Sequence, residues 1–428
     1  MTRRFPQVGS RDRERRTNVS RSTTIVIAAR NAETTIERAV ASACMQGSHP
    51  ILLVDDFSAD KTIARALDCA GGRLRIVRPA AHSTLGAARQ TGLAEIRTPF
   101  GVWLDADDEF LPGRVDHMVA ELKTGRTDLV SDEVELCDGQ SGTSRGILHI
   151  PQFLKEHHPL AHLFERNYLP GVGVLGFSTD FARRVGYDPR FHGAEDIDFV
   201  LRAIVAGARF SLMNRVGYRL YAYPGSLSRR IENQRIMYRE ALRKHDYAHV
   251  KMIYRSAGHD DRTAIWGLVS MAIFREEYES ALKFAAELEM AEHRPERVHE
   301  PDGPSSQSEN WRLLFYRGTI LLLLGRASDA LMHLRECERL NPTAEGANNL
   351  GVAFRATGDS EHASILFSKS LALRPGYLDA QLNLENESLF RVTTHPFRLV
   401  MNRDDYVESP PLSESSANRR AQREEMFS

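Results

Sequence analysis

The sequence of 428 residues is poor in several features that mark specialised proteins. Its 4 cysteines are scattered with no C-x-x-C pair, which argues against a disulfide framework or a zinc site and fits a reducing compartment. A formal net charge of −1 provides no overall field that would attract nucleic acid. The longest apolar run, "TILLLLG" at residues 319–325, is too short to span a bilayer. We therefore expect a cytoplasmic globular protein without a nucleic-acid partner.

The two ends of the chain are polar and low in apolar residues. Residues 1–22 are rich in arginine, but no apolar stretch follows the charges, so we expect a disordered basic tail and no signal peptide. Attraction of this tail to anionic lipid at the inner face of a membrane is the alternative. Residues 391–428, with "VESPPLSESSANRR", predict a disordered polar tail.

Between residues 23 and about 207, short β-rich runs alternate with helical patterns. The runs "TTIVIAA", "PILLVDD", "RLRIVRP" and "FGVWLDADD" predict four strands. Helices are predicted over "NAETTIERAVASACMQ", over "SADKTIARALDCA" with Ser58 as N-cap, and over "LGAARQTGLAEI". This order predicts an α/β domain with a mainly parallel central sheet. Ligands of such sheets bind outside the carboxyl ends of the strands.

The pattern becomes all-helical near residue 256, and a repeat appears there. Four small or proline positions recur after 33 residues: Gly318, Gly325, Ala330 and Pro342 return as Gly351, Gly358, Ala363 and Pro375. This resembles the tetratricopeptide repeat, with a degenerate copy over 265–290 and a flexible insertion over 292–310. An unspecialised helical bundle is the alternative. We predict domains at 23–255 and 256–390.

The stretch "VWLDADDEFLPGR" places acids directly after an apolar run. Asp105 and Asp107 lie two apart, so in an extended chain they point the same way and repel unless a proton or cation joins them. Mg²⁺ and Mn²⁺ prefer such oxygen ligands. The alternative is a solvated group of acids that begins the next helix. That alternative explains Asp108 and Glu109 well, but leaves Asp105 unexplained.

Two more acidic groups follow apolar segments. Asp55 and Asp56 end the second predicted strand, where they could accept hydrogen bonds from a base or ribose or merely precede a helix cap. Glu195 and Asp196 in "FHGAEDIDFVLRAIVAG" could supply a general base, or could simply stabilise a helix N-terminus. Each group alone is weak evidence for a site.

Together, and in this order, these segments resemble the family 2 glycosyltransferases of the GT-A fold. The resemblance runs from "TTIVIAARNAETTIERAVASACMQ" through "ILLVDDFSADKT", "LGAARQTGL" and "VWLDADDEFLPGR" to "VGYDPRFHGAEDIDFVLRAIVAG". It covers about half the chain, residues 23–228. A short D-x-D motif is loosely specific, whereas five segments in order are strongly specific.

The resemblance implies a role for each matching residue on the donor side. Asp107 would bind Mn²⁺ or Mg²⁺, and Asp105 would share the metal and face the nucleotide sugar. Arg89 would stabilise the nucleotide moiety. Asp55 and Asp56 would contact the base. The end of the first strand, at Ala29 and Asn31, would border the same nucleotide-sugar pocket.

The resemblance also implies where the acceptor reacts. Asp196 would be the catalytic base, with Glu195 as its neighbour and as the alternative base. Tyr223, Ser226 and Ser228 in "YAYPGSLS" would form a lid over the diphosphate. Ala28, Arg30 and Gln90 depart from the family pattern, so the base is left open. We expect a UDP-sugar, with GDP- and dTDP-sugars as alternatives.

The resulting hypothesis is a metal-dependent inverting glycosyltransferase with a GT-A domain and an all-α tetratricopeptide-like module. Its acceptor would be a glycan, a lipid-linked sugar or a protein, in cell-surface polysaccharide, glycolipid or glycoprotein synthesis. The repeats would bind a protein partner, the acceptor or a second copy. One rival is an inactive glycosyltransferase-like scaffold acting through its repeats. The other is a nucleotidyltransferase, although "AARNAETT" lacks the Gly-rich phosphate loop that such an enzyme needs.

Two further patterns suggest only structural roles. Gly171, Gly173 and Gly176 give a G-x-G-x-x-G spacing, but no strand precedes it and no dinucleotide-binding unit surrounds it. His157 and His162 in "EHHPLAH" lie in a polar connector. We expect that connector to be a surface loop over the acceptor site and not a metal site.

Overall fold

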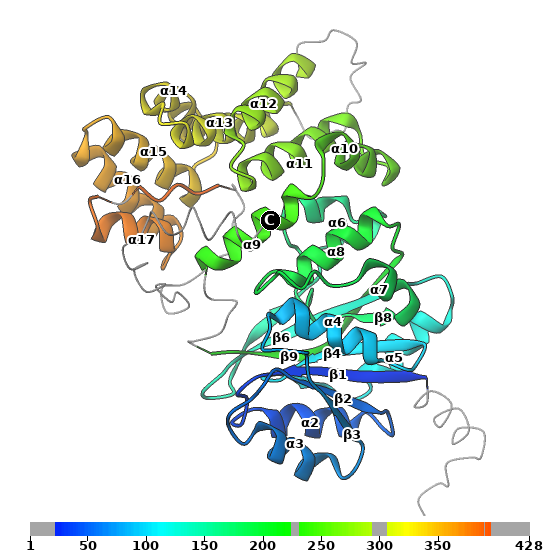
Figure 1. Ribbon diagram of the computed structural model, residues 1–428. Helices are drawn as coiled ribbons and strands as arrows, with labels where there is room; N and C mark the ends of the chain where they lie inside the picture. Colours follow the sequence, from blue (N-terminus) through cyan, green and yellow to red (C-terminus); the bar gives the residue numbers. More distant parts are fainter. Residues whose placement is uncertain (1–21, 224–230, 293–305, 389, 395–428) are drawn as a thin grey trace, which may run out of the picture.

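A computed structural model describes residues 22–223, 231–292, 306–388 and 390–394 (Figure 1). An α/β region built on one sheet comes first, and an all-helical region follows it, as the sequence predicts. None of the helices within these residues is long and apolar enough to cross a membrane.

One mixed sheet organises the first half of the chain. Its strands are β1 (Thr23–Ala29), β2 (Ile51–Asp55), β3 (Leu74–Val77), β4 (Phe100–Asp105), β5 (Glu109–Phe110), β6 (Leu129–Asp138), β7 (Ser144–Leu148), β8 (Gly176–Ser178) and β9 (Phe210–Ala222). They lie in the order β3-β2-β1-β4-β8-β6-β9-β5, and β7 pairs with β6. The four strands predicted from the sequence, β3-β2-β1-β4, run parallel, whereas β8, β5 and β7 pair antiparallel with their neighbours.

Helices cover both faces of the sheet because apolar residues of the strands alternate between them. Ile25 and Ile27 pack with α2 (Ile36–Met45), α3 (Thr62–Ala70) and α5 (Arg114–Lys123). Val26 packs on the opposite face with α4 (Leu85–Glu95), α7 (Thr179–Val185) and α8 (Glu195–Val205). The short helices α6 (Gln152–Glu156) and η1 (Ala161–Phe164) lie between β7 and β8 in the chain.

Two local predictions are wrong. Ser58 does not cap α3, which begins at Thr62; its hydroxyl accepts from the Asn31 amide instead, and Asp60 accepts from Thr62 N at 2.9 Å. Asp108 and Glu109 do not begin a helix, since the next helix, α5, starts at Arg114. Asp108 is a buried residue of the turn between β4 and β5.

The second half of the described chain is helical throughout. Its helices are α9 (Ile231–Arg243), α10 (Tyr247–Ser256), α11 (Asp261–Phe274), α12 (Tyr278–Glu292), α13 (Ser306–Leu323), α14 (Ala327–Leu340), α15 (Ala344–Ala356), α16 (Ser360–Leu373) and α17 (Leu378–Glu385). Both ends of α16 follow those of α14 by 33 residues. In each pair a glycine allows close packing, because a Cβ on Gly318 or Gly351 would meet Leu334 at 2.4 Å or Phe367 at 2.7 Å.

The two halves share an apolar core across the predicted boundary at residue 255. Ala264 and Leu268 of α11 belong to the same buried cluster as Val26 and the helices over that face. Arg312 of α13 pairs with the buried Glu165 at 3.1 Å. Figure 1 shows α9, α10 and α11 on the side of α8 that faces away from the sheet, with α12–α17 beyond them.

The predicted histidine loop packs into this junction. The ring of His259, which precedes α11, lies 4.1 Å from that of His157 and 4.7 Å from that of His162, centroid to centroid. These histidines therefore contact the helical half, and the connector is not a free loop above the sheet edge.

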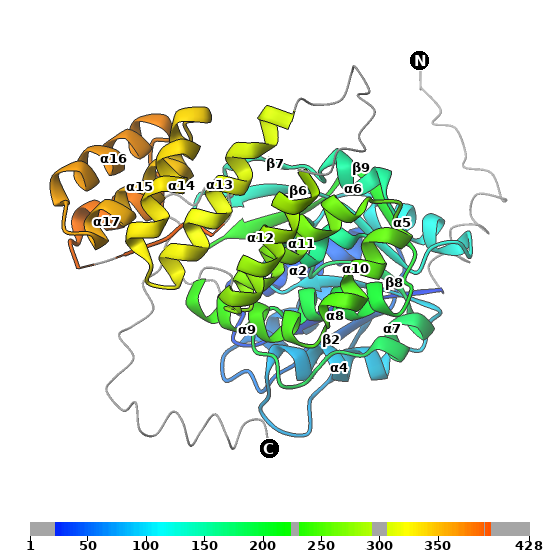
Figure 2. The same cartoon turned by 90° about the horizontal axis from the view of Figure 1, so that it is seen from above.

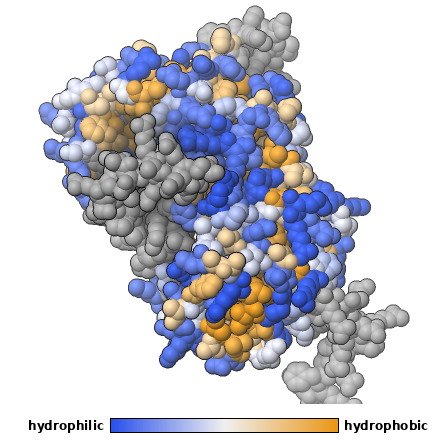
Figure 3. Space-filling model, viewed as in Figure 1, coloured by the Kyte–Doolittle hydropathy of each residue, from blue (hydrophilic) through white to orange (hydrophobic). Residues whose placement is uncertain are grey.

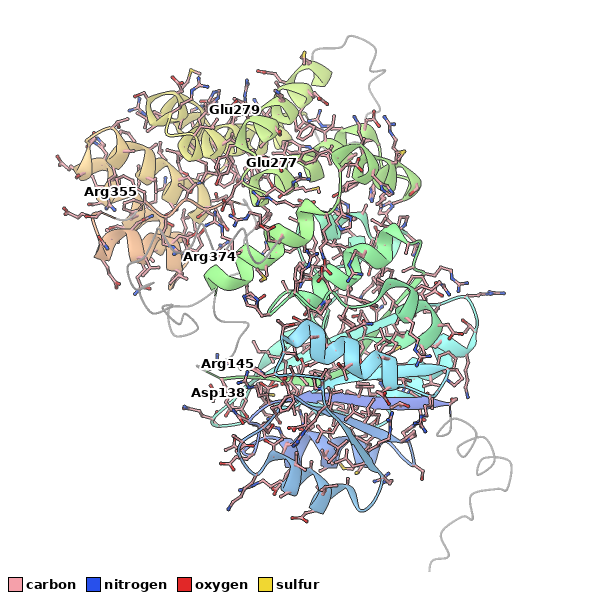
Figure 4. All side chains as sticks on the ribbon, viewed as in Figure 1. Asp138, Arg145, Glu277, Glu279, Arg355 and Arg374 are labelled. Atoms are coloured by element: carbon pink, nitrogen blue, oxygen red, sulfur yellow. The ribbon has the colours of Figure 1, made fainter. Side chains whose placement is uncertain are left out.

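The surface of the α/β half and the C-terminal segment have distinct features. Figure 3 shows polar side chains over much of one face and an apolar patch in its lower part, over the α/β half. Asp138 and Arg145 form an ion pair in the hairpin of β6 and β7 (Figure 4).

Residues 391–394, expected to begin a disordered tail, pack against the helices instead. Residues 395–428 lie outside the described part.

Candidate functional site

The register of three parallel strands brings the predicted acids to one edge of the sheet. Ala29 of β1 pairs with Asp55 of β2, and Ala28 pairs with Asp105 of β4 on the other side. The carboxyl ends of β2, β1 and β4 therefore lie side by side. This register places Asp55 and Asp56 on one side of β1, and the Asp105–Asp107 turn on the other.

Arg89 of α4 connects the acids that come from distant parts of the chain. Its guanidinium donates from Nε to Glu195 Oε1 at 2.9 Å, from Nη2 to Asp105 Oδ1 at 2.9 Å and from Nη1 to the carbonyl of Gly173 at 2.8 Å. The residue is 2% exposed, and its guanidinium lies over the Trp103 ring. A planar guanidinium suits this fork-like arrangement, which the ammonium of lysine could not reproduce.

The charges around Arg89 do not balance. Burial alone would lower the Arg89 pKa, but Asp105 and Glu195 raise it above its usual range. Burial and the nearby Asp196 raise the pKa of Glu195, against the opposing effect of Arg89. Burial also raises the pKa of Asp196. One guanidinium thus faces three carboxyl groups, so the site favours an added proton or cation.

The turn after β4 holds a second pair of acids with perturbed pKa values. Burial and then the charge of Asp105 raise the pKa of Asp107 to about 6. Asp108 is buried and its pKa is raised well above the usual value by burial and by Asp107. Its carboxylate accepts from the Tyr218 hydroxyl and the Tyr221 amide, both at 2.8 Å. These bonds fix the turn to β9.

Asp105 and Asp107 would provide two carboxylates for a divalent cation, which would need further oxygen ligands from a bound phosphate compound. Within the described ranges no cluster of three or more His, Cys, Asp or Glu side chains could hold a metal ion. Asp105 gives one oxygen to Arg89 and is 38% exposed at its side chain, while no ion pair to Asp107 is found among the described residues. Mg²⁺ and Mn²⁺ commonly bind one or two carboxylates together with phosphate oxygens.

The acids after β2 are held by a separate set of cations and donors. Asp55 accepts from Arg78 Nε at 2.9 Å and from the Ser58 amide at 3.2 Å. Asp56 accepts from the Ser83 amide at 3.0 Å and lies 3.0 Å from His82 Nδ1.

The backbone of the same lip is also fixed. The carbonyl of Ala29 accepts from the Asp56 amide, and Asn31 Oδ1 accepts from the Ala59 amide at 2.9 Å. Arg30, one of the departures from the family pattern, lies with Nη1 2.6 Å from His82 Nε2. His82 therefore contacts both Asp56 and Arg30 at the predicted base pocket.

The sequence analysis did not identify Arg38 as part of the site, and it assigned Gly173 only a structural role. Arg38 of α2 donates to the carbonyl of Asp107 and to the Tyr223 hydroxyl, and it stacks over the Tyr221 ring at 3.6 Å. A Cβ at Gly173 would lie 3.0 Å from Asp196 Oδ2 and 3.2 Å from Arg89 Nη2, a tight contact that these side chains would have to shift to relieve. The G-x-G-x-x-G spacing was the only sequence feature that drew attention to Gly173.

The predicted lid is only partly described. Tyr223 contacts Arg38 as stated, whereas Ser226 and Ser228 lie outside the described residues.

Comparison with known proteins supports the resemblance over the first half of the chain. Residues 24–184 match the model of Glycosyl transferase family 2, which confirms the predicted resemblance over this segment. The chain is 33% identical over 220 residues to the succinoglycan biosynthesis protein ExoU of Rhizobium meliloti, covering 48% of this chain and 63% of that protein. It is 28% identical over 192 residues to the pre-mycofactocin glycosyltransferase of Mycobacterium tuberculosis, covering 44% and 40%. The chain thus spans less than two thirds of either relative.

A looser likeness exists to a solved structure. TarS 1–349 of S. aureus in complex with UDP-GlcNAc has a TM-score of 0.45 and 14% identity, over 83% of this chain and 93% of that chain.

We predict that Arg89→Met destabilises the protein because it leaves the buried Glu195 carboxylate without its cation. Removing one partner of a buried ion pair costs about 3–5 kcal/mol, because the other carboxylate stays buried and unpaired. Adding Glu195→Gln should restore part of this loss, since glutamine is neutral. Urea unfolding followed by circular dichroism measures both variants. A double variant as unstable as Arg89→Met alone would contradict the assigned pairing.

Proposed function

We propose that this protein is a metal-dependent inverting glycosyltransferase, which moves a sugar from a nucleoside diphosphate donor to an acceptor hydroxyl. The observation that carries the proposal is the Arg89 fork. It joins Asp105 at the end of β4 to Glu195 at the start of α8. Most of the residues involved lie in the segment that matches the family model, and the fork brings the acids after that segment into the same site.

The donor would bind along the carboxyl ends of β2, β1 and β4. Asp55 and Asp56 would accept hydrogen bonds from the base, beside Ala29 and Asn31. Asp107, with Asp105, would hold Mn²⁺ or Mg²⁺ together with the diphosphate oxygens. When bound, such an ion neutralises the charge that develops on the leaving diphosphate. We favour a UDP-sugar, and keep GDP- and dTDP-sugars as alternatives.

Asp196 is our choice for the base, and Glu195 is the alternative. Glu195 is committed to Arg89 at 2.9 Å, whereas Asp196 Oδ2 lies against Gly173, outside that fork. Burial raises the pKa of Asp196, which makes it a better proton acceptor than an ordinary aspartate. The acceptor hydroxyl would lose its proton to Asp196 as its oxygen attacks the anomeric carbon opposite the diphosphate. This direct displacement inverts the configuration.

The rest of the chain would serve the acceptor or a partner. We propose that α13–α16 form tetratricopeptide-like repeats, in domains near 23–255 and 256–390. A protein partner, self-association or the acceptor would use the module. A glycan, lipid-linked or protein acceptor in cell-surface polysaccharide, glycolipid or glycoprotein synthesis fits this hypothesis. We place the reaction in the cytoplasm or at the inner face of the membrane.

A panel of UDP-, GDP- and dTDP-sugars with Mn²⁺ or with EDTA tests the proposal. We expect slow release of nucleoside diphosphate from one donor, faster with an extract of acceptors, and none with EDTA. Release of pyrophosphate would indicate a nucleotidyltransferase instead. If no donor is cleaved and no nucleotide raises the melting temperature, the inactive-scaffold alternative is favoured.

We predict that Asp196→Asn lowers turnover by at least about 100-fold while donor affinity stays within about threefold. Asparagine keeps the shape but cannot accept the proton. The base acts only when it is deprotonated, and the pKa of Asp196 is raised. As the pH is lowered, kcat of the intact enzyme should therefore begin to fall at a higher pH than it would with an aspartate of ordinary pKa. Asp180→Asn, an exposed acid in the first turn of α7, is the matched control and should leave turnover unchanged. Near-normal turnover in Asp196→Asn would rule out this base.

A further inference from the structure

The segment 390–394 runs as an extended chain along the inner side of the helical region. Figures 1 and 2 show it in orange-red, passing α15 and α17. It forms no helix or strand. Three asparagines, Asn348 and Asn349 of α15 and Asn383 of α17, lie against it, and each is 0% exposed. Buried amides need hydrogen-bond partners, and here the main chain of the segment supplies them.

Two of these asparagines contact alternate residues of the segment in the same way. Asn349 Oδ1 accepts from the Thr393 amide and Asn349 Nδ2 donates to the Thr393 carbonyl, both at 2.8 Å. Asn383 Oδ1 accepts from the Arg391 amide at 2.8 Å, and Asn383 Nδ2 donates to the Arg391 carbonyl at 3.0 Å. These paired bonds resemble those that a neighbouring β-strand makes. They recognise an extended main chain whatever its side chains.

A pocket for one side chain adds sequence preference. The Thr393 hydroxyl donates to Asp379 Oδ2 at 2.9 Å and lies 2.6 Å from the Tyr377 hydroxyl. Asn348 Nδ2 also donates to the Thr393 hydroxyl oxygen, at 3.3 Å. Thr393 is 0% exposed. A residue without a hydroxyl would lose the hydrogen bonds to Asp379 and Tyr377 in a buried pocket, so this pocket favours threonine or serine.

A second preference concerns the residue two positions earlier. Arg391 Nε donates to Asp379 Oδ1 at 3.2 Å, so one buried carboxylate contacts both side chains. Val392 between them packs against the apolar cluster of α15 and α16. The site favours the pattern Arg-x-Thr in an extended chain.

The groove is held in shape by the helices themselves. Arg355, labelled on α15 in Figure 4, donates from Nη1 to the carbonyl of Asn383 at 2.7 Å. Asn383 Nδ2 also donates to Asn348 Oδ1 at 2.9 Å. The asparagines of α15 and α17 are thus cross-linked to each other as well as to the segment.

We propose that α15 and α17 form a binding groove for an extended polypeptide with the pattern Arg-x-Thr or Arg-x-Ser, and that residues 391–393 occupy it as an intramolecular plug. The alternative is a structural cap that completes the packing of the last helices, to which the contact of Val392 would also belong. What favours a binding groove is that Asn349 and Asn383 each pair with both the amide and the carbonyl of one residue of the segment, groups that any extended polypeptide carries. Because the plug is part of the same chain, its high effective concentration excludes a competing peptide until it is released. This inference does not depend on the proposed enzymatic activity.

A labelled peptide of residues 390–394, acetyl-FRVTT-amide, tests the groove by fluorescence anisotropy. The full-length chain carrying Thr393→Pro loses the amide and hydroxyl of its plug, and we expect it to bind the peptide at least about tenfold more tightly than the intact chain. Adding Asn349→Ala should weaken that binding at least about tenfold. Adding Asn341→Ala, the same substitution at the end of α14, should not.

A chain that ends at Ser388 serves as a second opened variant, free of the effects of proline. Far-UV circular dichroism should show the helix content of both variants unchanged. Equal peptide binding by intact and opened chains would overturn the plug. Absence of binding to two well-folded opened variants would overturn the groove. An intact chain that is a dimer in solution, and becomes a monomer with Thr393→Pro, would overturn the intramolecular assignment in favour of exchange between two copies.

Discussion

The Arg89 guanidinium is the interaction on which the candidate site depends. It satisfies a carboxylate from β4, a carboxylate from α8 and a carbonyl from the loop before β8, and it does so while almost fully buried. Without it, these acids would repel one another in a poorly solvated edge of the sheet. With it, one guanidinium still faces an excess of negative charge. That imbalance supports the proposed divalent cation, which would bring positive charge to this edge together with the diphosphate.

The sequence predicts those parts of the site that are local. Apolar runs ending in acids locate β2 and β4 and their carboxyl ends, so Asp55, Asp56, Asp105 and Asp107 could be placed together. The burial of Asp108 could not be predicted, because it depends on Tyr218, which lies 110 residues away.

Other features of the structure depend on similarly distant partners. The sequence predicts Ser58 as a helix cap, but its hydroxyl oxygen accepts a hydrogen bond from the Asn31 amide instead. The contact of Asn349 with Thr393 joins residues 44 apart, and a tail of polar composition gave no indication of it.

Binding of Mn²⁺, measured by isothermal titration with and without UDP, tests the account most directly. Two carboxylates alone should bind the ion weakly, and the diphosphate should supply the missing oxygens. We therefore predict one Mn²⁺ per chain, bound at least about tenfold more tightly with UDP present, and loss of that gain in Asp107→Asn. Equal Mn²⁺ affinity with and without UDP, or an unchanged gain in Asp107→Asn, would contradict a nucleotide-sugar site at this edge of the sheet.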